Sequence, residues 1–141
     1  MALVFWDTNL FVYLLEENRT FGESVRELNR RMEARRDRLV TSALTIGEIL
    51  VKPIRENDSD SEKRYRAIFS GPDIQIAAFD AYAAQVYAYV RQDGAIRVAD
   101  AIQLACAASA KVDLFITNDD RLSRKKVPGI HFVTSLARAP I

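Results

Sequence analysis

Hydrophobic positions along the chain alternate between short unbroken runs and longer stretches with helical spacing. Residues 2–6 form an apolar run without polar alternation, which is typical of a strand buried on both faces. Residues 113–117 are a strand candidate around the similar run Leu114-Phe115-Ile116. Residues 39–40, 74–77 and 131–134 are three further strand candidates. Helical patterns lie between the strands, over residues 8–16, 22–38, 44–51, 62–70, 81–90 and 97–110.

Capping and turn residues mark several ends of these elements. Thr41 or Ser42 is expected to cap the helix that follows the second strand, and Pro53 to kink or end it. The polar run 57–61 predicts a loop, and Pro128-Gly129 predicts a turn into the last strand.

Strands separated by helices predict right-handed crossovers and a mostly parallel sheet. We therefore expect a three-layer α/β/α fold around a five-stranded sheet. No Pro/Gly/Ser-rich linker divides the 141 residues, so one domain over residues 1–141 is expected. In such sheets ligands bind at the carboxyl ends of the strands, near the point where the strand order reverses.

Composition excludes several classes of protein. No apolar run approaches the roughly 18 residues that a membrane helix needs, so no membrane association is expected. A single cysteine, Cys106, allows no internal disulfide, and a cytoplasmic protein is expected. His131 is the only histidine, which argues against a zinc site and a histidine-pair nuclease. The net charge of +1 decides nothing about nucleic acid.

Four acidic residues lie in or beside apolar runs: Asp7, Glu48, Asp100 and Asp119. A carboxylate in apolar surroundings is costly unless a cation or hydrogen-bond donors compensate it. Asp7 and Asp119 come just after predicted strands, at the edge where ligands bind. Because hard divalent cations take oxygen ligands, a shared metal site would explain all four acids.

Asp100 lies in the most apolar of the predicted helices. Arg97, Asp100 and Gln103 are spaced by three residues, which places them on one narrow polar stripe of that helix. Each of the four acids also has a purely structural explanation. These are an N-cap for Asp7, a capping box with Thr45 for Glu48, a pair with Arg97 for Asp100, and an Asx turn for Asp119.

At these residues the chain resembles the PIN domain family of metal-dependent ribonucleases, especially the stand-alone VapC-like toxins of type II toxin–antitoxin modules. Each matching motif is short, but their order and spacing are fairly specific. The motifs are Val4-Phe5-Trp6-Asp7-Thr8-Asn9, Thr45-Ile46-Gly47-Glu48-Ile49-Leu50, Ala99-Asp100-Ala101-Ile102-Gln103-Leu104-Ala105, Phe115-Ile116-Thr117-Asn118-Asp119 and Val127-Pro128-Gly129-Ile130.

The resemblance implies a PIN-like fold and an endoribonuclease that uses one or two Mg²⁺ or Mn²⁺ ions. Asp7, Asp100 and Asp119 match the family's metal-holding acids, and Glu48 either binds metal or orients the attacking water. Asp120 is the rival of Asp119 for the fourth acidic position. The accompanying polar positions match Thr8, Asn9, Thr117 and Asn118.

An RNA substrate needs positive charge near the acids. Candidate phosphate-binding residues are Arg97, Arg121, Arg124, Lys125 and Lys126; a solvated connecting turn explains the last four equally well. The run from Arg30 to Arg38 is diluted by acids and is interpreted as a solvated helix face. The resemblance further implies a cognate antitoxin and a homodimer.

A catalytically inactive PIN-like module that binds RNA or protein is the main alternative. Other folds with acids at strand ends fit less well. A receiver-type phosphoacceptor needs an acidic pair where Asp7 stands alone, and a dehalogenase-like phosphatase needs an acid where the chain has Asn9.

Overall fold

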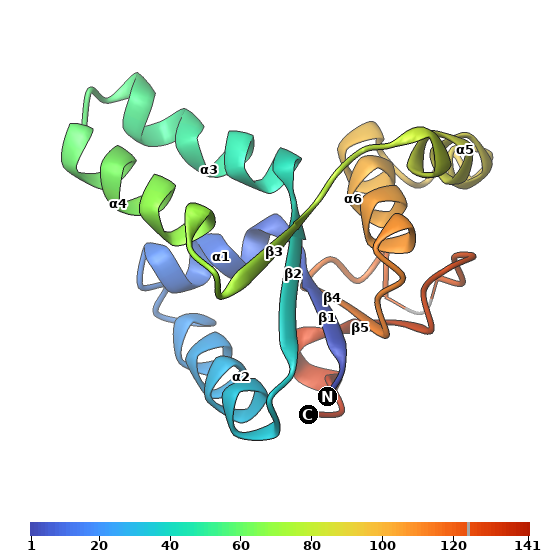
Figure 1. The fold of residues 1–141 in the computed structure, drawn as a ribbon, viewed down its shortest axis with the longest axis horizontal. Helices are drawn as coiled ribbons and strands as arrows, with labels where there is room; N and C mark the ends of the chain where they lie inside the picture. Colours follow the sequence, from blue (N-terminus) through green and yellow to red (C-terminus); the bar gives the residue numbers. More distant parts are fainter. Residues whose placement is uncertain (124) are drawn as a thin grey trace.

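A computed structural model of the protein, which describes residues 1–123 and 125–141, contains a five-stranded sheet (Figure 1). Every adjacent pair of strands is parallel, in the order β3-β2-β1-β4-β5. The five predicted strands and their parallel arrangement are therefore confirmed. The strands are β1 (Leu3–Trp6), β2 (Arg38–Ser42), β3 (Ile74–Ala77), β4 (Leu114–Thr117) and β5 (Phe132–Ser135).

Helices cover both faces of this sheet, as the three-layer prediction requires. Figure 1 shows α1 to α4 on one side of the strands and α5 and α6 on the other. In the described part of the chain, none of the helices has the length and apolar character that crossing a membrane requires. The helices are α1 (Thr8–Leu15), α2 (Gly22–Arg35), α3 (Ala43–Arg55), α4 (Ser59–Ser70), α5 (Ala81–Val90), α6 (Val98–Ser109) and the short 3₁₀ helix η1 (Leu136–Arg138).

The unbroken apolar runs of β1 and β4 supply both halves of the core. Val4 and Trp6 pack with the α1–α4 layer, whereas Phe5 between them packs with α5 and α6. In β4, Phe115 likewise faces the second layer and stacks on Phe5, with 4.9 Å between ring centroids. Because successive strand residues point to opposite faces, only a strand covered on both sides can be apolar throughout.

Two predicted element boundaries are wrong, each for a local reason. The helix predicted over 22–38 ends at Arg35, because Arg36 adopts a left-handed conformation (φ 60°) and β2 begins at Arg38. The loop predicted over 57–61 is mostly helix, because the Asp58 side chain accepts a hydrogen bond from the Ser61 N–H and caps α4. Of the two effects expected of Pro53, a kink or an end of the helix, the structure excludes the end, because α3 continues to Arg55.

The turn predicted at Pro128-Gly129 is present and needs its glycine. Gly129 has a φ of +91°, and a Cβ atom there would lie 3.0 Å from the Ala108 carbonyl oxygen. The close approach packs the segment before β5 against the end of α6.

Candidate active site

The strand order places β1 and β4 side by side at the point where the sheet changes direction. From β1 the chain adds β2 and β3 on one side, and β4 and β5 then fill the other. Trp6 pairs with Ile116, so Asp7 and Thr117 are neighbours at the carboxyl edge. The Asp7 N–H donates to the Ile116 carbonyl at 3.0 Å, which fixes the backbone at this junction. This is the location in which open parallel sheets bind ligands.

All four predicted acids line one cavity of about 250 Å³ at this edge. Asp7 comes from the end of β1, Glu48 from α3, Asp100 from the first turn of α6, and Asp119 from the segment after β4. Residues separated by more than 100 positions are thus brought together by the parallel crossovers. The cavity is also lined by Thr8, Asn9, Val12, Arg97, Ala99 and Gln103.

Asp7 is the buried member of the set, with 6% of its surface exposed. The Thr117 hydroxyl donates to Asp7 Oδ2 at 2.7 Å, and the Thr8 N–H donates to Oδ1 at 2.8 Å. Burial nevertheless raises the pKa of Asp7 from 3.8 to about 6, and the nearby carboxylates of Asp100 and Glu48 contribute. No ion pair reaches Asp7 from the described residues.

The other three acids are less buried than their apolar sequence neighbours suggested. Glu48 is exposed, because it lies on the face of α3 opposite Ile49 and Leu50. The side chains of Asp100 and Asp119 are 14% and 17% exposed. The expectation of largely shielded surroundings is therefore wrong for Glu48, whereas Asp100 and Asp119 are largely shielded but lie beside arginines.

Two arginines hold the carboxylates of Asp100 and Asp119. Arg121 binds Asp119 through two side-chain contacts, Nη2 to Oδ2 at 2.6 Å and Nε to Oδ1 at 3.0 Å. Arg97 lies 3.4 Å from an Asp100 oxygen and 3.7 Å from one of Asp119. The hydrogen bonds and charge of Arg121 lower the pKa of Asp119.

The structural explanations considered for the acids are present for three of them. Asp7 is the N-cap of α1, Arg97 pairs with Asp100, and the Arg121 N–H donates to Asp119 Oδ1 in an Asx-type turn. The capping box suggested for Glu48 is absent, because Ser42 caps α3 by accepting from the Thr45 N–H. Capping and lining the cavity are compatible, since a capping carboxylate keeps unused lone pairs.

The structure distinguishes the two candidates for the fourth acid. Asp119 lines the cavity, whereas Asp120 is exposed and is not among its lining residues. The Thr117 hydroxyl accepts a hydrogen bond from the Asp119 N–H at 3.1 Å. Thr117 therefore links Asp7 and Asp119 at the shared edge.

The remaining predicted polar residues are divided between the cavity and other contacts. The Thr8 hydroxyl donates to Glu48 Oε1 at 2.7 Å. Asn9 lines the cavity, and its buried Oδ1 has no hydrogen-bond partner among the described residues. Asn118 instead donates to the Tyr13 hydroxyl at 3.2 Å, so the structure does not place it in the cavity.

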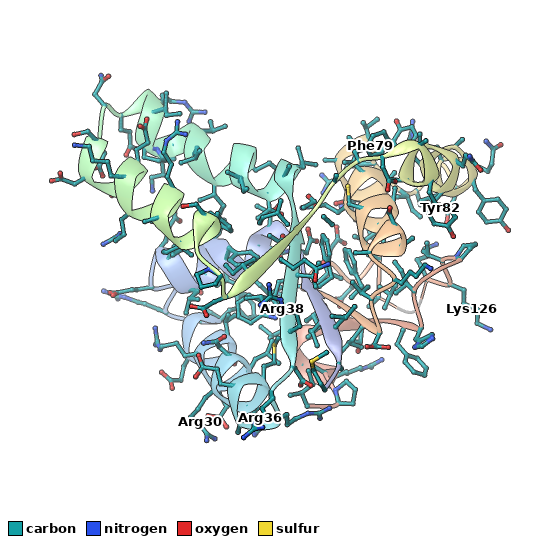
Figure 2. All side chains as sticks on the ribbon, in the orientation of Figure 1. Arg30, Arg36, Arg38, Phe79, Tyr82 and Lys126 are labelled. Carbon is teal, nitrogen blue, oxygen red and sulfur yellow. The ribbon has the colours of Figure 1, made fainter. Side chains whose placement is uncertain are left out.

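Of the predicted basic residues that the structure describes, only Arg97 and Arg121 are brought to the acids. Lys125 forms an ion pair with Asp93 at 2.7 Å, and it lines a separate hollow with Lys126. Lys126 lies on the flank away from the helices α1 to α4 (Figure 2). The prediction of a basic loop beside the acids is therefore wrong for both lysines. Arg124 lies outside the described residues.

The arginine run of α2 is a solvated face, as predicted. Arg30 and Arg31 both pair with Glu27. Arg36 precedes β2 and Arg38 is its first residue, at the end of the strand opposite the cavity. Figure 2 shows Arg30 and Arg36 close together, and Arg38 instead donates to the Pro72 carbonyl at 2.7 Å. These residues take no part in the candidate site.

A buried polar network beneath the cavity was not predicted as part of a site. Gln103 is 1% exposed and its side chain contacts those of Thr8, Thr45 and Ser42. The sequence feature that could have indicated this role is the position of Gln103 on the polar stripe of an otherwise apolar helix. Three hydroxyl residues on other elements meet it, which periodicity within one helix cannot reveal.

The donors present fit a hard divalent cation. Four carboxylates line one cavity, and carboxylate oxygens are the protein ligands that Mg²⁺ and Mn²⁺ prefer. Buried Asp7, which no cation of the described chain compensates, is the group that an ion would stabilise most. In the described ranges, no three His, Cys, Asp or Glu side chains are gathered closely enough to share an ion as they stand. Asp100 and Asp119 face the two arginines instead.

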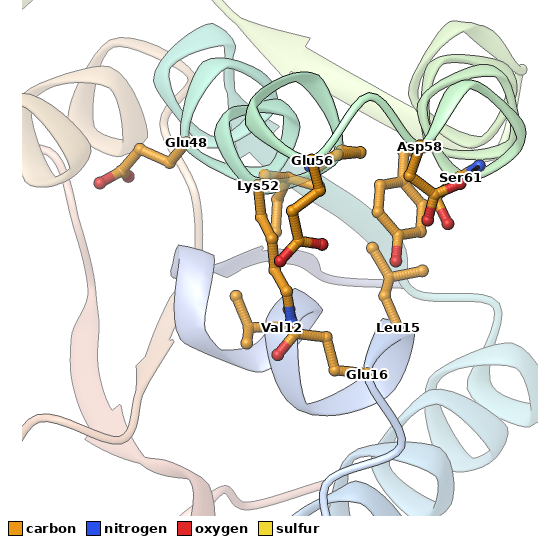
Figure 3. Close-up of a pocket in the computed structure, with 11 residues that line it drawn as sticks. Val12, Leu15, Glu16, Glu48, Lys52, Glu56, Asp58 and Ser61 are labelled. Atoms are coloured by element: carbon orange, nitrogen blue, oxygen red, sulfur yellow. Dashed lines mark hydrogen bonds and ion pairs between the residues drawn. The ribbon is translucent and has the colours of Figure 1, made fainter.

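A second hollow of about 210 Å³ adjoins the cavity between α1, α3 and α4 (Figure 3). Val12 and Glu48 line both spaces. In Figure 3 the Glu48 carboxylate points away from Lys52, which pairs with Glu16 at 3.3 Å. Glu48 thus forms the boundary between the two spaces.

Comparisons with solved structures find the same fold in toxin–antitoxin proteins. A chain of VapBC2 from Rickettsia felis, bound to a promoter DNA fragment, matches with a TM-score of 0.73 and 16% identity over 94% of this chain and 98% of that one. A toxin–antitoxin complex from Klebsiella pneumoniae matches with a TM-score of 0.65 and 23% identity, over 92% and 95%. VapC20 from Mycobacterium tuberculosis, a sarcin–ricin loop cleaving toxin, matches with a TM-score of 0.62 and 16% identity, over 79% and 86%.

Sequence comparison gives the family. No curated protein matches the chain in sequence. The sequence model of the PIN domain matches residues 4–128, which include all four acids of the cavity. The protein therefore belongs to the PIN domain family.

Proposed function

We propose that this protein is a Mg²⁺- or Mn²⁺-dependent endoribonuclease and the toxin of a type II toxin–antitoxin module. The observation that carries the proposal is the cavity lined by Asp7, Glu48, Asp100 and Asp119, with Asp7 buried and uncompensated. An inactive binding module would have no use for a carboxylate whose charged form is disfavoured by its surroundings. Membership of the PIN family and the fold of VapC toxins support the same reading.

The proposed roles follow from where each side chain lies. Asp7, Asp100 and Asp119 would hold one or two cations, and Glu48 would bind an ion or orient the attacking water. Cations held there would supply an activated water and stabilise the leaving oxygen of the phosphodiester. Thr117 fixes Asp7 through its hydroxyl, and Thr8 fixes Glu48 in the same way.

The proposed substrate is RNA. Arg97 and Arg121 lie at the cavity with 67% and 49% of their side chains exposed, so they can reach a phosphate. Preference for RNA over DNA rests on the similarity to toxins such as VapC20. Because each arginine also pairs with an acid, binding of cation and of phosphate is expected to be coupled.

The proposed partner is a cognate antitoxin, since two of the similar structures are toxin–antitoxin complexes. The hollow of Figure 3 is the surface we assign to it. Its lining combines apolar residues such as Leu15 and Tyr65 with four carboxylates and one lysine, which suits a basic amphipathic segment. We further propose a homodimer, a cytoplasmic location and one domain over residues 1–141.

RNA cleavage by purified protein tests this proposal. Wild type, Asp7→Asn and Asp120→Asn are incubated with structured RNA in Mg²⁺, in Mn²⁺ and in a chelator. Asp120→Asn is the matched control, because it removes the same charge from an exposed residue outside the cavity. Cleavage by wild type and Asp120→Asn in either metal, and by neither in chelator, is expected, with Asp7→Asn inactive. RNA binding without cleavage by wild type would instead indicate the inactive module.

A further inference from the structure

Gln103 connects the helix that carries Asp100 to the helix and strand ends that carry Glu48 and Asp7. It lies on α6, one turn after Asp100, and is almost completely buried. Its amide nitrogen donates to the hydroxyls of Thr8 and Thr45, both at 2.8 Å. Its amide oxygen accepts from the Ser42 hydroxyl. All hydrogen-bonding capacity on the amide nitrogen is thus used inside the protein.

The direction of these hydrogen bonds follows from counting hydrogens. The Thr8 hydroxyl has one hydrogen, and it donates to Glu48 Oε1 at 2.7 Å. Its oxygen is therefore free to accept from Gln103, which has hydrogens to give. Were the amide turned around, the Gln103 oxygen would compete with Glu48 for the single Thr8 hydrogen. The orientation with nitrogen toward Thr8 is the one that satisfies every group.

The second branch of the network anchors Gln103 to the sheet. Thr45 Oγ1 lies 2.8 Å from the Thr41 hydroxyl, which donates to the Trp6 carbonyl at 3.0 Å. Trp6 immediately precedes Asp7. The amide is therefore fixed relative to the end of β1, and Thr8 is the only link of the network that reaches a cavity carboxylate.

We propose that Gln103 is a positioning residue that, acting through Thr8, aims the Glu48 carboxylate into the acidic cavity. Glu48 is exposed and borders the second hollow, so without this contact its flexible side chain could turn toward Lys52 (Figure 3). The hydrogen bond from Thr8 occupies Oε1 and leaves Oε2 free for an ion or a water. This proposal rests on the function proposed above, because it assigns Glu48 a task in that reaction.

Three single variants test the proposal. Gln103→Met keeps the side-chain length and removes both donors. Thr8→Val removes the hydroxyl that joins Gln103 to Glu48, and it leaves the contacts of Gln103 with Thr45 and Ser42 in place. Ser109→Ala is the matched control, because it removes a side-chain hydrogen bond from the same helix α6, where the Ser109 hydroxyl donates to Asp80 at 2.7 Å and has no contact with the network. The measurements are the melting temperature, kcat and KM for RNA, and the ¹³C resonance of the Glu48 carboxyl group in metal-free protein.

Gln103→Met and Thr8→Val are expected to lower kcat by about 10-fold at unchanged KM, the range seen for groups that orient a reacting residue. Both should shift the Glu48 carboxyl resonance alike, while Ser109→Ala lowers the melting temperature and changes neither kcat nor that resonance. Should Gln103→Met fail to fold, Thr8→Val alone decides the question. An unmoved resonance and unchanged kcat in Thr8→Val would overturn the proposal. If wild type does not cleave RNA but the two variants still shift the Glu48 resonance, the proposed nuclease function is wrong and the positioning of Glu48 by the network stands.

Discussion

The carboxylates at the two ends of the acidic cavity are stabilised by different kinds of contact. At the outer end, Asp100 and Asp119 are partly exposed and are held by Arg97 and Arg121. At the inner end, Asp7 is buried and receives two hydrogen bonds but no positive charge from the described chain. Hydrogen bonds alone do not offset its desolvation, because its pKa still rises to about 6. A cation, as proposed above, would relieve this cost at the inner end, whereas the arginines already offset the charge at the outer end.

Among the changes considered, replacing the acids should reduce RNA cleavage most, and the reduction should be larger for the inner acid than for the outer one. Asp7→Asn is expected to reduce kcat/KM for RNA by about 1,000-fold, comparable to losing a central transition-state contact. Asp119→Asn should cost less, about 10-fold to 100-fold, because Asp100 remains beside it. Single-turnover cleavage rates in Mn²⁺ measure both. Equal losses from the two variants would remove the distinction between inner and outer ends.

The pH dependence of stability should report the inner end alone. Asp7 has a pKa of about 6 in the folded protein and 3.8 as its ordinary value, so the folded state binds more protons between these pH values. Stability from this group is complete below pH 3.8 and is lost as the pH rises through 6, a decrease of about 3 kcal/mol.

Urea unfolding of wild type and Asp7→Asn at several pH values from 3 to 7 measures this contribution. The difference in unfolding free energy between the two proteins should change by that amount across the window, since the amide does not titrate. A difference independent of pH would mean that Asp7 is already compensated in the metal-free protein.

Removing an arginine from the outer end should strengthen cation binding, in contrast to the loss expected when an acid is removed. Arg121→Gln frees Asp119 from its bidentate partner, so the dissociation constant for Mn²⁺ is expected to fall about twofold to fivefold, the scale of an exposed ion pair. Lys126→Gln removes the same charge from a separate surface and is the control. Calorimetric titration without RNA gives both constants. Weaker Mn²⁺ binding by Arg121→Gln would show that the arginine supports the ion rather than competing with it.

Much of the fold could be predicted from the sequence because it depends on periodicity. The apolar runs of β1 and β4 require cover on both faces, which predicts a parallel sheet, and parallel strands place Asp7 and Asp119 at the same carboxyl edge. Helix ends were less predictable, because a single side-chain contact from Asp58 turned an expected loop into the first turn of α4. The left-handed Arg36 likewise shortened α2 without any glycine to signal it.

The sequence predicted which four acids line the cavity, but it did not predict how exposed they are or which residues they contact. Apolar neighbours in sequence say little about exposure, because Glu48 points away from the face that Ile49 and Leu50 bury. Lys125 of the predicted basic loop pairs with Asp93, which lies 32 positions away in the sequence, and it therefore does not contact the acids of the cavity. Gln103 stood on a recognised polar stripe, yet its partners come from three other segments of the chain. Such contacts are set by tertiary packing.

Direct titration of Mn²⁺ into metal-free wild type and Asp7→Asn, without RNA, tests the central claim that the four acids form one cation site centred on Asp7. The account predicts saturable binding of one or two ions by wild type and loss of that binding in Asp7→Asn, with Asp120→Asn like wild type. Equal affinities in wild type and Asp7→Asn would contradict it.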